Sequence, residues 1–368
     1  MSERFIGLMS GTSLDGVDGV LAQWPGQDGA PLRVLAHAHL PFDAVLADEL
    51  LALNTRGDDE LHRAALAGNT LARRYAEVVA RLLAGAGVDA GAVTAIGAHG
   101  QTVRHRPQDG YTLQLNSPAL LAELTGIAVV ADLRSRDVAA GGQGAPLVPA
   151  FHRAMFGRAG EALALLNLGG IANLTLLGAD GSVLGFDCGP ANALLDHWVR
   201  RHRGEAFDRD GRWAAGGRVD AALLAELQAE PYFALPPPKS TGRDLFHAEW
   251  LARRLAARGA LAPADVQATL VELSAWAAAR DLVAHRPDAR ELLVCGGGAF
   301  NTHLMARLAA RLPGVRVAST AERGLPPDQV EACAFAWLAR AFVRGDSASL
   351  PSVTGARGAR VLGALYPK

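Results

Sequence analysis

Near its start the chain reads Phe5-Ile6-Gly7-Leu8-Met9-Ser10-Gly11-Thr12-Ser13-Leu14-Asp15-Gly16-Val17-Asp18, an apolar strand that runs directly into a turn of small and acidic residues. In such a turn, glycines and hydroxyls leave backbone N–H groups free to face an anion, and carboxylates can hold a hydrated divalent cation. The segment therefore predicts a loop for phosphate and magnesium. An ordinary Gly/Asp hairpin turn is the alternative, and the Walker A pattern G-x-x-x-x-G-K-[ST] does not occur in the chain.

The first strand is followed by two more. Residues 17–24 read as a return strand, and residues 32–40 alternate between apolar and polar side chains, which is the period of a half-buried strand. At residues 71–82, apolar side chains recur every three or four positions, which predicts an amphipathic helix. Further strands are predicted at residues 93–98, 112–115 and 127–131.

The same order of elements recurs in the second half. Residues 163–168 form an apolar strand, Gly169-Gly170 a turn, residues 171–177 a return strand, and residues 183–186 a third strand that leads into Asp187. A helix follows. This recurrence predicts an internal duplication. Two such halves facing each other would place both glycine turns on opposite sides of one cleft.

The composition is that of a globular protein. At 368 residues the chain is long enough for two domains or one large α/β unit. Half of its residues are hydrophobic and its formal net charge is -1, so there is no electrostatic case for binding nucleic acid or a membrane surface. The start lacks a signal peptide's apolar region and the three cysteines are isolated, so we expect a cytoplasmic protein without a disulfide framework or zinc cluster.

Three later segments could bind ligands. Gly296-Gly297-Gly298 follows a short apolar strand, but Asn301 stands where a dinucleotide fingerprint needs its last glycine. Residues 134–144 crowd two arginines and several flexible residues after a strand, which is typical of a binding loop. Residues 239–244 follow three prolines and form either a loop that closes over a ligand or a surface linker. This segment holds Lys239, the one lysine inside the chain.

Two acidic residues are candidates for function. Asp187 precedes a rigid Gly-Pro turn and a helix, so from the residues alone it is either a turn-forming or helix-capping aspartate or a base. Glu331 lies in an apolar helical stretch. Because glutamate is rarely buried without a partner, that position favours a functional role.

Taken together, these motifs resemble the anhydro-N-acetylmuramic acid kinase family. They keep their order from the first strand to the last turn, so the resemblance covers essentially the whole chain. The matching segments are Gly7 to Asp18, His99-Gly100-Gln101-Thr102, Arg136-Asp137 with Gly141-Gly142-Gln143-Gly144-Ala145-Pro146, Asn167-Leu168-Gly169-Gly170-Ile171-Ala172-Asn173, Phe186-Asp187-Cys188-Gly189-Pro190, Gly296-Gly297-Gly298-Ala299 with Asn301, and Pro351-Ser352-Val353-Thr354-Gly355-Ala356. One departure is Ala191, where the family often has glycine.

The resemblance implies an α/β protein with the duplicated actin-like ATPase (ribonuclease H-like) fold, in which two domains clamp ATP in a central nucleotide cleft. The domains are expected at residues 1–130, completed by residues 345–368, and at residues 131–344. The implied reaction uses ATP and water to convert 1,6-anhydro-N-acetylmuramic acid to N-acetylmuramic acid 6-phosphate in peptidoglycan recycling. ATP and Mg2+ are the implied cofactors, the partner is a small sugar, and a homodimer is possible.

The resemblance also implies residue roles. Asp187 is the general base, Arg136 binds the lactyl carboxylate or nearby oxygens of the sugar, and Glu331 orients the sugar. Asp15 and Asp18 hold Mg2+ through water. The ATP-binding residues are Gly11, Thr12, Ser13, Leu14, Asp15, Gly16, Val17 and Asp18 around the phosphates, Gly169 and Gly170 from the other domain, and Gly296, Gly297 and Gly298 near the nucleoside.

Other functions remain as alternatives. In the first alternative, the chain is a kinase for another anhydro sugar such as levoglucosan. In the second, it is an actin-like ATPase that binds a protein partner and uses the nucleotide as a switch. Proteins of the second kind carry an additional domain or polymer contacts, and the chain ends soon after Gly355. An esterase is suggested by Gly11-Thr12-Ser13-Leu14-Asp15, but the nucleophile elbow G-x-S-x-G requires glycine where Asp15 stands.

Overall fold

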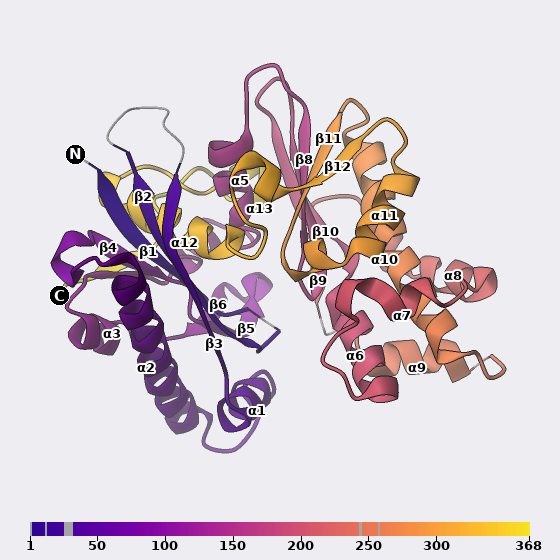
Figure 1. Ribbon diagram of the computed structural model, residues 1–368. Helices are drawn as coiled ribbons and strands as arrows, with labels where there is room; N and C mark the ends of the chain where they lie inside the picture. Colours follow the sequence, from indigo (N-terminus) through magenta and orange to yellow (C-terminus); the bar gives the residue numbers. More distant parts are fainter. Residues whose placement is uncertain (1, 12, 26–31, 243–244, 257) are drawn as a thin grey trace. The chain divides into compact units, whose positions relative to one another are not determined.

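The computed structural model describes residues 2–11, 13–25, 32–242, 245–256 and 258–368 (Figure 1). The chain divides into two compact units. Unit 1 consists of Met1–Met155 and Gln329–Lys368, and unit 2 consists of Phe156–Asp328. Each unit contains its own sheet and its own hydrophobic core.

Unit 1 is built on a six-stranded sheet with the strand order β13-β7-β4-β1-β2-β3. The first three strands form an antiparallel meander, whereas β4 and β7 continue the sheet in parallel from β1. The strands are β1 (Glu3–Met9), β2 (Gly16–Trp24), β3 (Arg33–Pro41), β4 (Ala95–Ala98), β7 (Val129–Ala131) and β13 (Ala364–Tyr366), with a separate pair β5 (Gln101–Arg106) and β6 (Tyr111–Leu115). The helices are α1 (Ala44–Ala52), α2 (Glu60–Ala86), α3 (Pro118–Thr125), α4 (Ser135–Ala139), α5 (Val148–Phe156), α12 (Val330–Arg344) and α13 (Pro351–Thr354).

Unit 2 is built on a five-stranded sheet with the strand order β10-β9-β8-β11-β12. Its meander is again antiparallel, and β11 and β12 continue in parallel from β8. The strands are β8 (Leu163–Leu168), β9 (Ile171–Leu177), β10 (Val183–Pro190), β11 (Glu291–Cys295) and β12 (Arg316–Ser319). The helices are α6 (Asn192–Arg203), α7 (Arg212–Ala215), α8 (Ala221–Gln228), α9 (Ala248–Ala256), α10 (Pro263–His285) and α11 (Thr302–Arg311).

The two sheets follow one plan. The order β3-β2-β1-β4-β7 in unit 1 corresponds to β10-β9-β8-β11-β12 in unit 2, with the same strand directions at each step. The predicted duplication is therefore confirmed, and with it the actin-like α/β fold class. In each unit the glycine turn joins the first two strands of the meander, so equivalent turns occupy equivalent places in the two sheets.

Helix α12 lies directly on the sheet of unit 1. Gly7 of β1 and Gly97 of β4 are register partners, and a Cβ atom on either would come closer than 3.0 Å to the backbone of α12, at Ala332 O and Phe335 O. The helix can therefore pack only where these two side chains are missing. This contact joins α12 to unit 1.

The bounds of the units differ from the expected ones for this reason. Unit 1 resumes at residue 329 rather than near residue 345, because α12 covers its sheet. Its first segment ends at residue 155 rather than 130, since α4 is bonded to α13 through Asp137 and Thr354 (Oγ1 to Oδ1, 2.9 Å).

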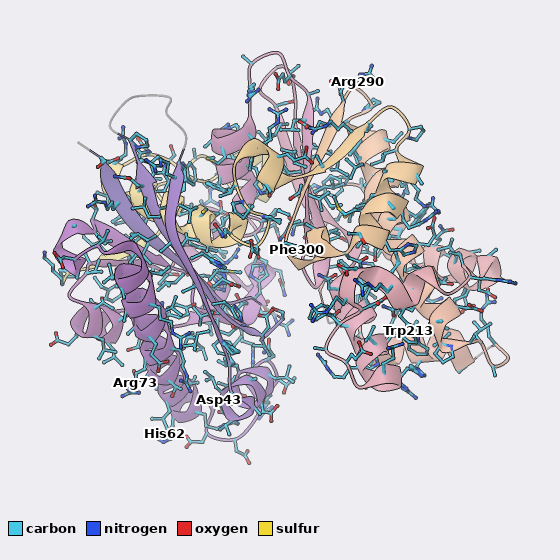
Figure 2. All side chains as sticks on the ribbon, in the orientation of Figure 1. Asp43, His62, Arg73, Trp213, Arg290 and Phe300 are labelled. Atoms are coloured by element: carbon cyan, nitrogen blue, oxygen red, sulfur yellow. The ribbon has the colours of Figure 1, made fainter. Side chains whose placement is uncertain are left out.

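Two long helices show how the cores are built. The helix predicted at residues 71–82 lies within α2, where Leu71 and Leu82 are buried in the core of unit 1 while His62 and Arg73 are exposed (Figure 2). In unit 2, α10 is buried along most of its length, including the charged Asp281. No helix in the described part of the chain is long and apolar enough to cross a membrane.

Candidate active site

A polar row crosses the sheet of unit 2. Asp187 of β10 is the register partner of Asn173 on β9, and Asn173 is the partner of Asn167 on β8. Side chains at paired positions share one face of a sheet, and neighbouring strands lie about 4.8 Å apart. The row therefore extends from Asp187 over about 10 Å to Asn167.

Strand β10 continues past its predicted end at residue 186 and is irregular just after Asp187. The register shifts between Asp187 and Gly189, and such a bulge re-aims the side chain beside it. The Asp187 N–H donates to Lys239 O (3.2 Å), and Tyr232 Oη donates to Asp187 O (2.6 Å). The backbone of Asp187 is thus held on both sides by the segment that precedes α9.

The Asp187 carboxyl group is suited to proton transfer. Its Oδ2 accepts a hydrogen bond from Thr241 N–H at 3.0 Å. Burial raises the pKa of Asp187 to about 6, against the opposing effects of the Thr241 N–H and the Lys239 charge. A carboxylate with such a pKa is ionised at neutral pH and can still accept a proton readily, which is the property of a general base.

A buried ion pair lies beside Asp187. The Lys239 Nζ atom is 2.9 Å from Asp281 Oδ2, and both side chains are 2% exposed. The same Nζ lies 5.5 Å from the ring centre of Phe186 and 5.2 Å from that of Tyr232. The segment expected to be a lid or a linker therefore places a cation inside unit 2. Its Arg243 and Asp244 lie outside the described residues.

The two predicted glycine turns of unit 2 meet at the far end of the polar row. Gly169 O accepts from Asn192 N (3.0 Å), and a Cβ atom on Gly296 would come closer than 3.0 Å to Asn167 Oδ1. Within the described residues, Asn167 Oδ1 is buried and has no hydrogen-bond partner. Gly169, Gly170 and Gly296 to Gly298 are therefore brought together, about two strands away from Asp187.

The predicted phosphate loop of unit 1 joins β1 to β2. Gly11 O accepts from Gln101 Nε2 (3.0 Å) and from Leu14 N (3.3 Å), and Ser13 Oγ donates to Asp15 Oδ1 (2.7 Å). Thr12 lies outside the described residues. The last three predicted residues of the loop, Gly16, Val17 and Asp18, belong to β2, and the Val17 side chain is part of the core.

The two predicted magnesium ligands have different surroundings. Asp15 is exposed, whereas Asp18 Oδ1 lies 2.9 Å from His39 Nδ1 and 3.6 Å from His37 Nε2. Burial disfavours the charge on Asp18, but the hydrogen bonds from His37 and His39 outweigh it and lower its pKa. Among the described residues neither carboxylate pairs with an arginine or a lysine. Both therefore fit a hydrated cation that needs carboxylate charge nearby.

A buried hydrogen-bond network holds the predicted phosphate loop in place. Arg134 donates from Nε (3.1 Å) and Nη2 (3.0 Å) to His99 Nε2, so the ring proton of His99 is on Nδ1, 3.1 Å from Ser10 O. Burial and the neighbouring Arg134 lower the pKa of His99 to about 3. His99 therefore remains neutral, and its place in the site is to fix the loop rather than to transfer protons.

The predicted sugar-binding residues lie close to this network. Burial lowers the pKa of Arg134 to about 10, and the carboxylates of Glu331 and Asp137 partly restore it. Glu331, in the first turn of α12, is thus near Arg134. Arg136 lies two residues after Arg134, in the first turn of α4, and is exposed.

Several residues of these sites were not assigned a role from the sequence. Asp281 has a detectable signal, because it follows a mostly apolar stretch of α10 and an aspartate is rarely buried without a partner. Asn167 and Asn173 stand in a quoted motif, but only the strand register shows that they line up with Asp187. Arg134 is half-buried and bonded to His99, whereas Arg136 is exposed, a difference that the sequence does not reveal.

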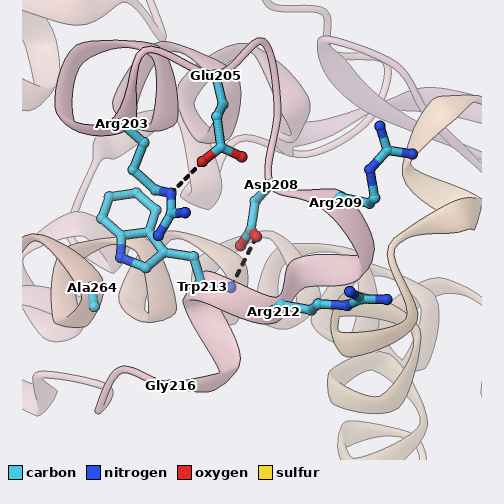
Figure 3. A pocket seen from close by; sticks show the side chains of 8 residues that line it. All are labelled: Arg203, Glu205, Asp208, Arg209, Arg212, Trp213, Gly216 and Ala264. Atoms are coloured by element: carbon cyan, nitrogen blue, oxygen red, sulfur yellow. Dashed lines mark hydrogen bonds and ion pairs between the residues drawn. The ribbon is translucent and has the colours of Figure 1, made fainter.

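A separate hollow of about 480 Å³ lies elsewhere in unit 2 (Figure 3). Several of its charged groups are already paired: Arg203 Nε donates to Glu205 Oε1 (2.6 Å), and both oxygens of Asp208 accept from backbone N–H groups of α7. None of the predicted site residues lines it. The lining residues are Arg203, Glu205, Asp208, Arg209, Arg212, Trp213, Gly216 and Ala264.

The chain matches known proteins along nearly its whole length. A family model described as "Anhydro-N-acetylmuramic acid kinase" matches residues 3–368. The chain is 63% identical over 374 residues to the anhydro-N-acetylmuramic acid kinase of Variovorax paradoxus (strain S110), with 99% of each chain covered. It is 59% identical over 391 residues to that of Albidiferax ferrireducens, with 100% of each chain covered. These matches confirm the predicted resemblance and make the chain a phosphotransferase: it belongs to the anhydro-N-acetylmuramic acid kinase family.

Proposed function

We propose that this chain uses ATP and water to convert 1,6-anhydro-N-acetylmuramic acid to N-acetylmuramic acid 6-phosphate, in the cytoplasmic recycling of peptidoglycan. The observation that carries the proposal is Asp187, whose carboxyl group has a pKa of about 6 and is held by the Thr241 N–H at a bulge in β10. A base of this kind can take a proton from water near neutral pH.

The reaction needs one carboxylate rather than two. Inverting hydrolysis of a glycosidic bond normally requires a base for the water and an acid for the departing oxygen. Here Asp187 takes a proton from the water that attacks C1, and the bond from C1 to O6 breaks. O6 forms its new bond to the γ-phosphorus of ATP as the bond from that phosphorus to the β,γ-bridging oxygen breaks, and ADP leaves with that oxygen. The phosphoryl group thus takes the place of the proton that an acid would supply.

Backbone N–H groups and glycine turns would hold the nucleotide. Phosphoryl transfer depends mainly on positioning and charge stabilisation. The segment from Gly11 to Asp18 would line the phosphates, Gly169 and Gly170 would also bind phosphate, and Gly296 to Gly298 would lie near the nucleoside. Asp15 and Asp18 would hold Mg2+ through water, and this ion supplies positive charge that offsets the charge of the phosphates.

Arg136 and Glu331 would select the sugar. The guanidinium group of Arg136 offers two parallel donors, which match the two oxygens of the lactyl carboxylate. Glu331 would accept hydrogen bonds from sugar hydroxyls. The half-buried Arg134, which lies near Glu331, would hold that carboxylate in place.

The first test replaces Asp187 with asparagine, which keeps the size of the side chain but cannot take up the proton. Turnover should fall by at least ~100-fold, the low end of what a positioned base contributes. Binding of ATP and of the sugar should persist. Asp288→Asn, at an exposed carboxylate of the same unit, is the matched control and should keep wild-type turnover. Near-normal turnover of Asp187→Asn would remove Asp187 from the mechanism.

The second test follows the oxygen atoms. In 18O-labelled water, over times too short for anomeric exchange, the label should enter the sugar at C1 and not the phosphate, because water attacks carbon while O6 keeps its own oxygen. Mass spectrometry of the product distinguishes the two positions. Label in the phosphate group would show that hydrolysis and transfer are not coupled in this way.

A further inference from the structure

Lys239 occupies an unusual place for a lysine. The chain has two lysines, Lys239 and Lys368, and arginine supplies the rest of its positive charge. Lysine is almost never fully buried unless it is paired. The Lys239 side chain is nevertheless 2% exposed, and its Nζ lies 2.9 Å from the equally buried Asp281 Oδ2 of α10. Burying such a pair costs desolvation energy, so we expect its surroundings to give it a role that explains its presence.

The local surroundings connect Lys239 to Asp187 at several points. The Lys239 carbonyl accepts the Asp187 N–H (3.2 Å), and two residues later the Thr241 N–H donates to Asp187 Oδ2 (3.0 Å). The ammonium group lies near the rings of Phe186, which precedes Asp187, and of Tyr232, whose hydroxyl donates to Asp187 O (2.6 Å). Residues 239–241 therefore contact Asp187 through their backbone, while the Lys239 side chain is paired with Asp281.

We propose that Lys239 is a positioning residue for Asp187: its side chain, anchored to Asp281 and flanked by the rings of Phe186 and Tyr232, holds residues 239–241 where their carbonyl and N–H groups fix the aspartate. This inference rests on the proposed function of Asp187 as the base. It assigns to the segment an anchored position beside the base instead of the role of a mobile lid or a linker.

The charge of Lys239 has a second effect. Burial raises the pKa of Asp187 and the Lys239 ammonium opposes that rise, so the cation keeps the base ionised at neutral pH. Ionisable groups on the elements around Asp187 include Lys239 itself, Cys188 of β10, Tyr232 between α8 and α9, and Arg280, Asp281 and His285 of α10. Cys188 and Tyr232 have pKa values raised by burial and are neutral at pH 7. Among the described residues, Lys239 is the cation whose charge lowers the pKa of Asp187.

The test compares the full-length enzyme with Lys239→Met, Lys239→Arg and the double variant Lys239→Met/Asp281→Leu. The double variant removes both buried charges, so that the site remains testable if the single Met variant fails to fold. Lys368→Met is the control. Two quantities are measured: the acid limb of the pH profile of kcat/KM, and the pKa of Asp187 in the resting enzyme from 13C NMR of labelled aspartate, assigned by its loss in Asp187→Asn.

In the two Met variants we expect the pKa of Asp187 and the acid limb to move up by about one pH unit, which lowers kcat/KM by about 10-fold at pH values below the limb. The KM for ATP should stay within about 2-fold of wild type, since a change in proton affinity alone does not alter nucleotide binding. Lys239→Arg keeps the charge and should retain the wild-type limb with a lower kcat, because guanidinium does not reproduce the geometry of the ammonium group. Lys368→Met should behave as wild type.

Unchanged pKa values in folded Met variants would overturn the inference, even if those variants were less stable. That result is separate from a failure of the proposed function. If Asp187→Asn kept its turnover, Asp187 would not be the base, whereas the NMR titration of the resting enzyme would still show whether Lys239 controls it. If Asp187→Asn were inactive but the pKa of Asp187 were unchanged in the Lys239→Met variants, the role of Lys239 would be refuted and the role of Asp187 as the base would stand.

Discussion

Replacing Asp187 with asparagine should stabilise the protein at neutral pH while it removes activity. The pKa of Asp187 is about 6 in the folded protein, compared with the ordinary value of 3.8. The folded state therefore binds this proton more tightly than the unfolded chain does. Because the unfolded state binds fewer protons between these two values, the free energy of unfolding falls as the pH rises from about 4 to about 6. A pKa difference of this size corresponds to about 3 kcal/mol.

Asparagine resembles the protonated acid, since it is neutral and its carbonyl oxygen can still accept the Thr241 N–H. Because the Asp187 side chain is partly exposed, we expect a gain of about 2 kcal/mol at pH 8, below the full value. For a unit of this size, the gain corresponds to a rise of about 4–8 °C in the melting temperature. At pH 4 the aspartate is itself protonated, so the gain should disappear.

The measurement is thermal unfolding followed by circular dichroism at pH 4 and pH 8, for the wild type, Asp187→Asn and the exposed control Asp288→Asn. A variant that melts at or below the wild-type temperature at pH 8 would refute the reasoning. So would an equal gain at both pH values, because an effect of the ionised carboxylate must depend on pH.

Two further substitutions test other parts of the molecule. Gly97→Ala would place a Cβ atom against Phe335 O, so it should destabilise the protein by about 1–3 kcal/mol, whereas Gly91→Ala, with nothing within 4 Å, should change the melting temperature little; equal melting temperatures would show that α12 adjusts freely. Arg136→Lys should raise the KM for the sugar far more than that for ATP, because lysine cannot donate two parallel hydrogen bonds to a carboxylate. An equal rise in the KM for ATP in steady-state kinetics would place Arg136 at the phosphates instead.

Local patterns were sufficient to predict the meanders of the two sheets. The strands at residues 163–168 and 171–177 have the predicted bounds, because a buried apolar run that ends at two glycines leaves few alternatives. Strand β5 (Gln101–Arg106) was not predicted, since its polar residues lack a clear alternation and, among the described residues, it pairs with β6 alone. Short β12 (Arg316–Ser319) likewise depends on pairing with β11, which is a contact distant in sequence.

The candidate site was predictable in its motifs but not in its connections. The resemblance to a family pointed to Asp187 and to the glycine turns. The groups that hold Asp187 in place lie far along the chain: Thr241 donates to its carboxylate, and Asp281 pairs with the neighbouring Lys239. The bounds of the two compact units differ from the expected domain bounds for the same physical reason. The contact of α12 with Gly7 and Gly97 joins residues more than 200 positions apart, and no local pattern encodes such a contact.

The return of the chain to unit 1 affects the order in which the protein is completed on the ribosome. Domains generally fold as units during synthesis, with the N-terminal one first. Here the sheet of unit 1 receives α12 and β13 only when residues 330–366 have emerged, because α12 packs on β1 and β4 and β13 pairs with β7. Unit 2 is encoded entirely by residues 156–328. The unit that is synthesised second is therefore the first to have all of its residues, and the N-terminal half of the nascent chain waits for its last helix and strand.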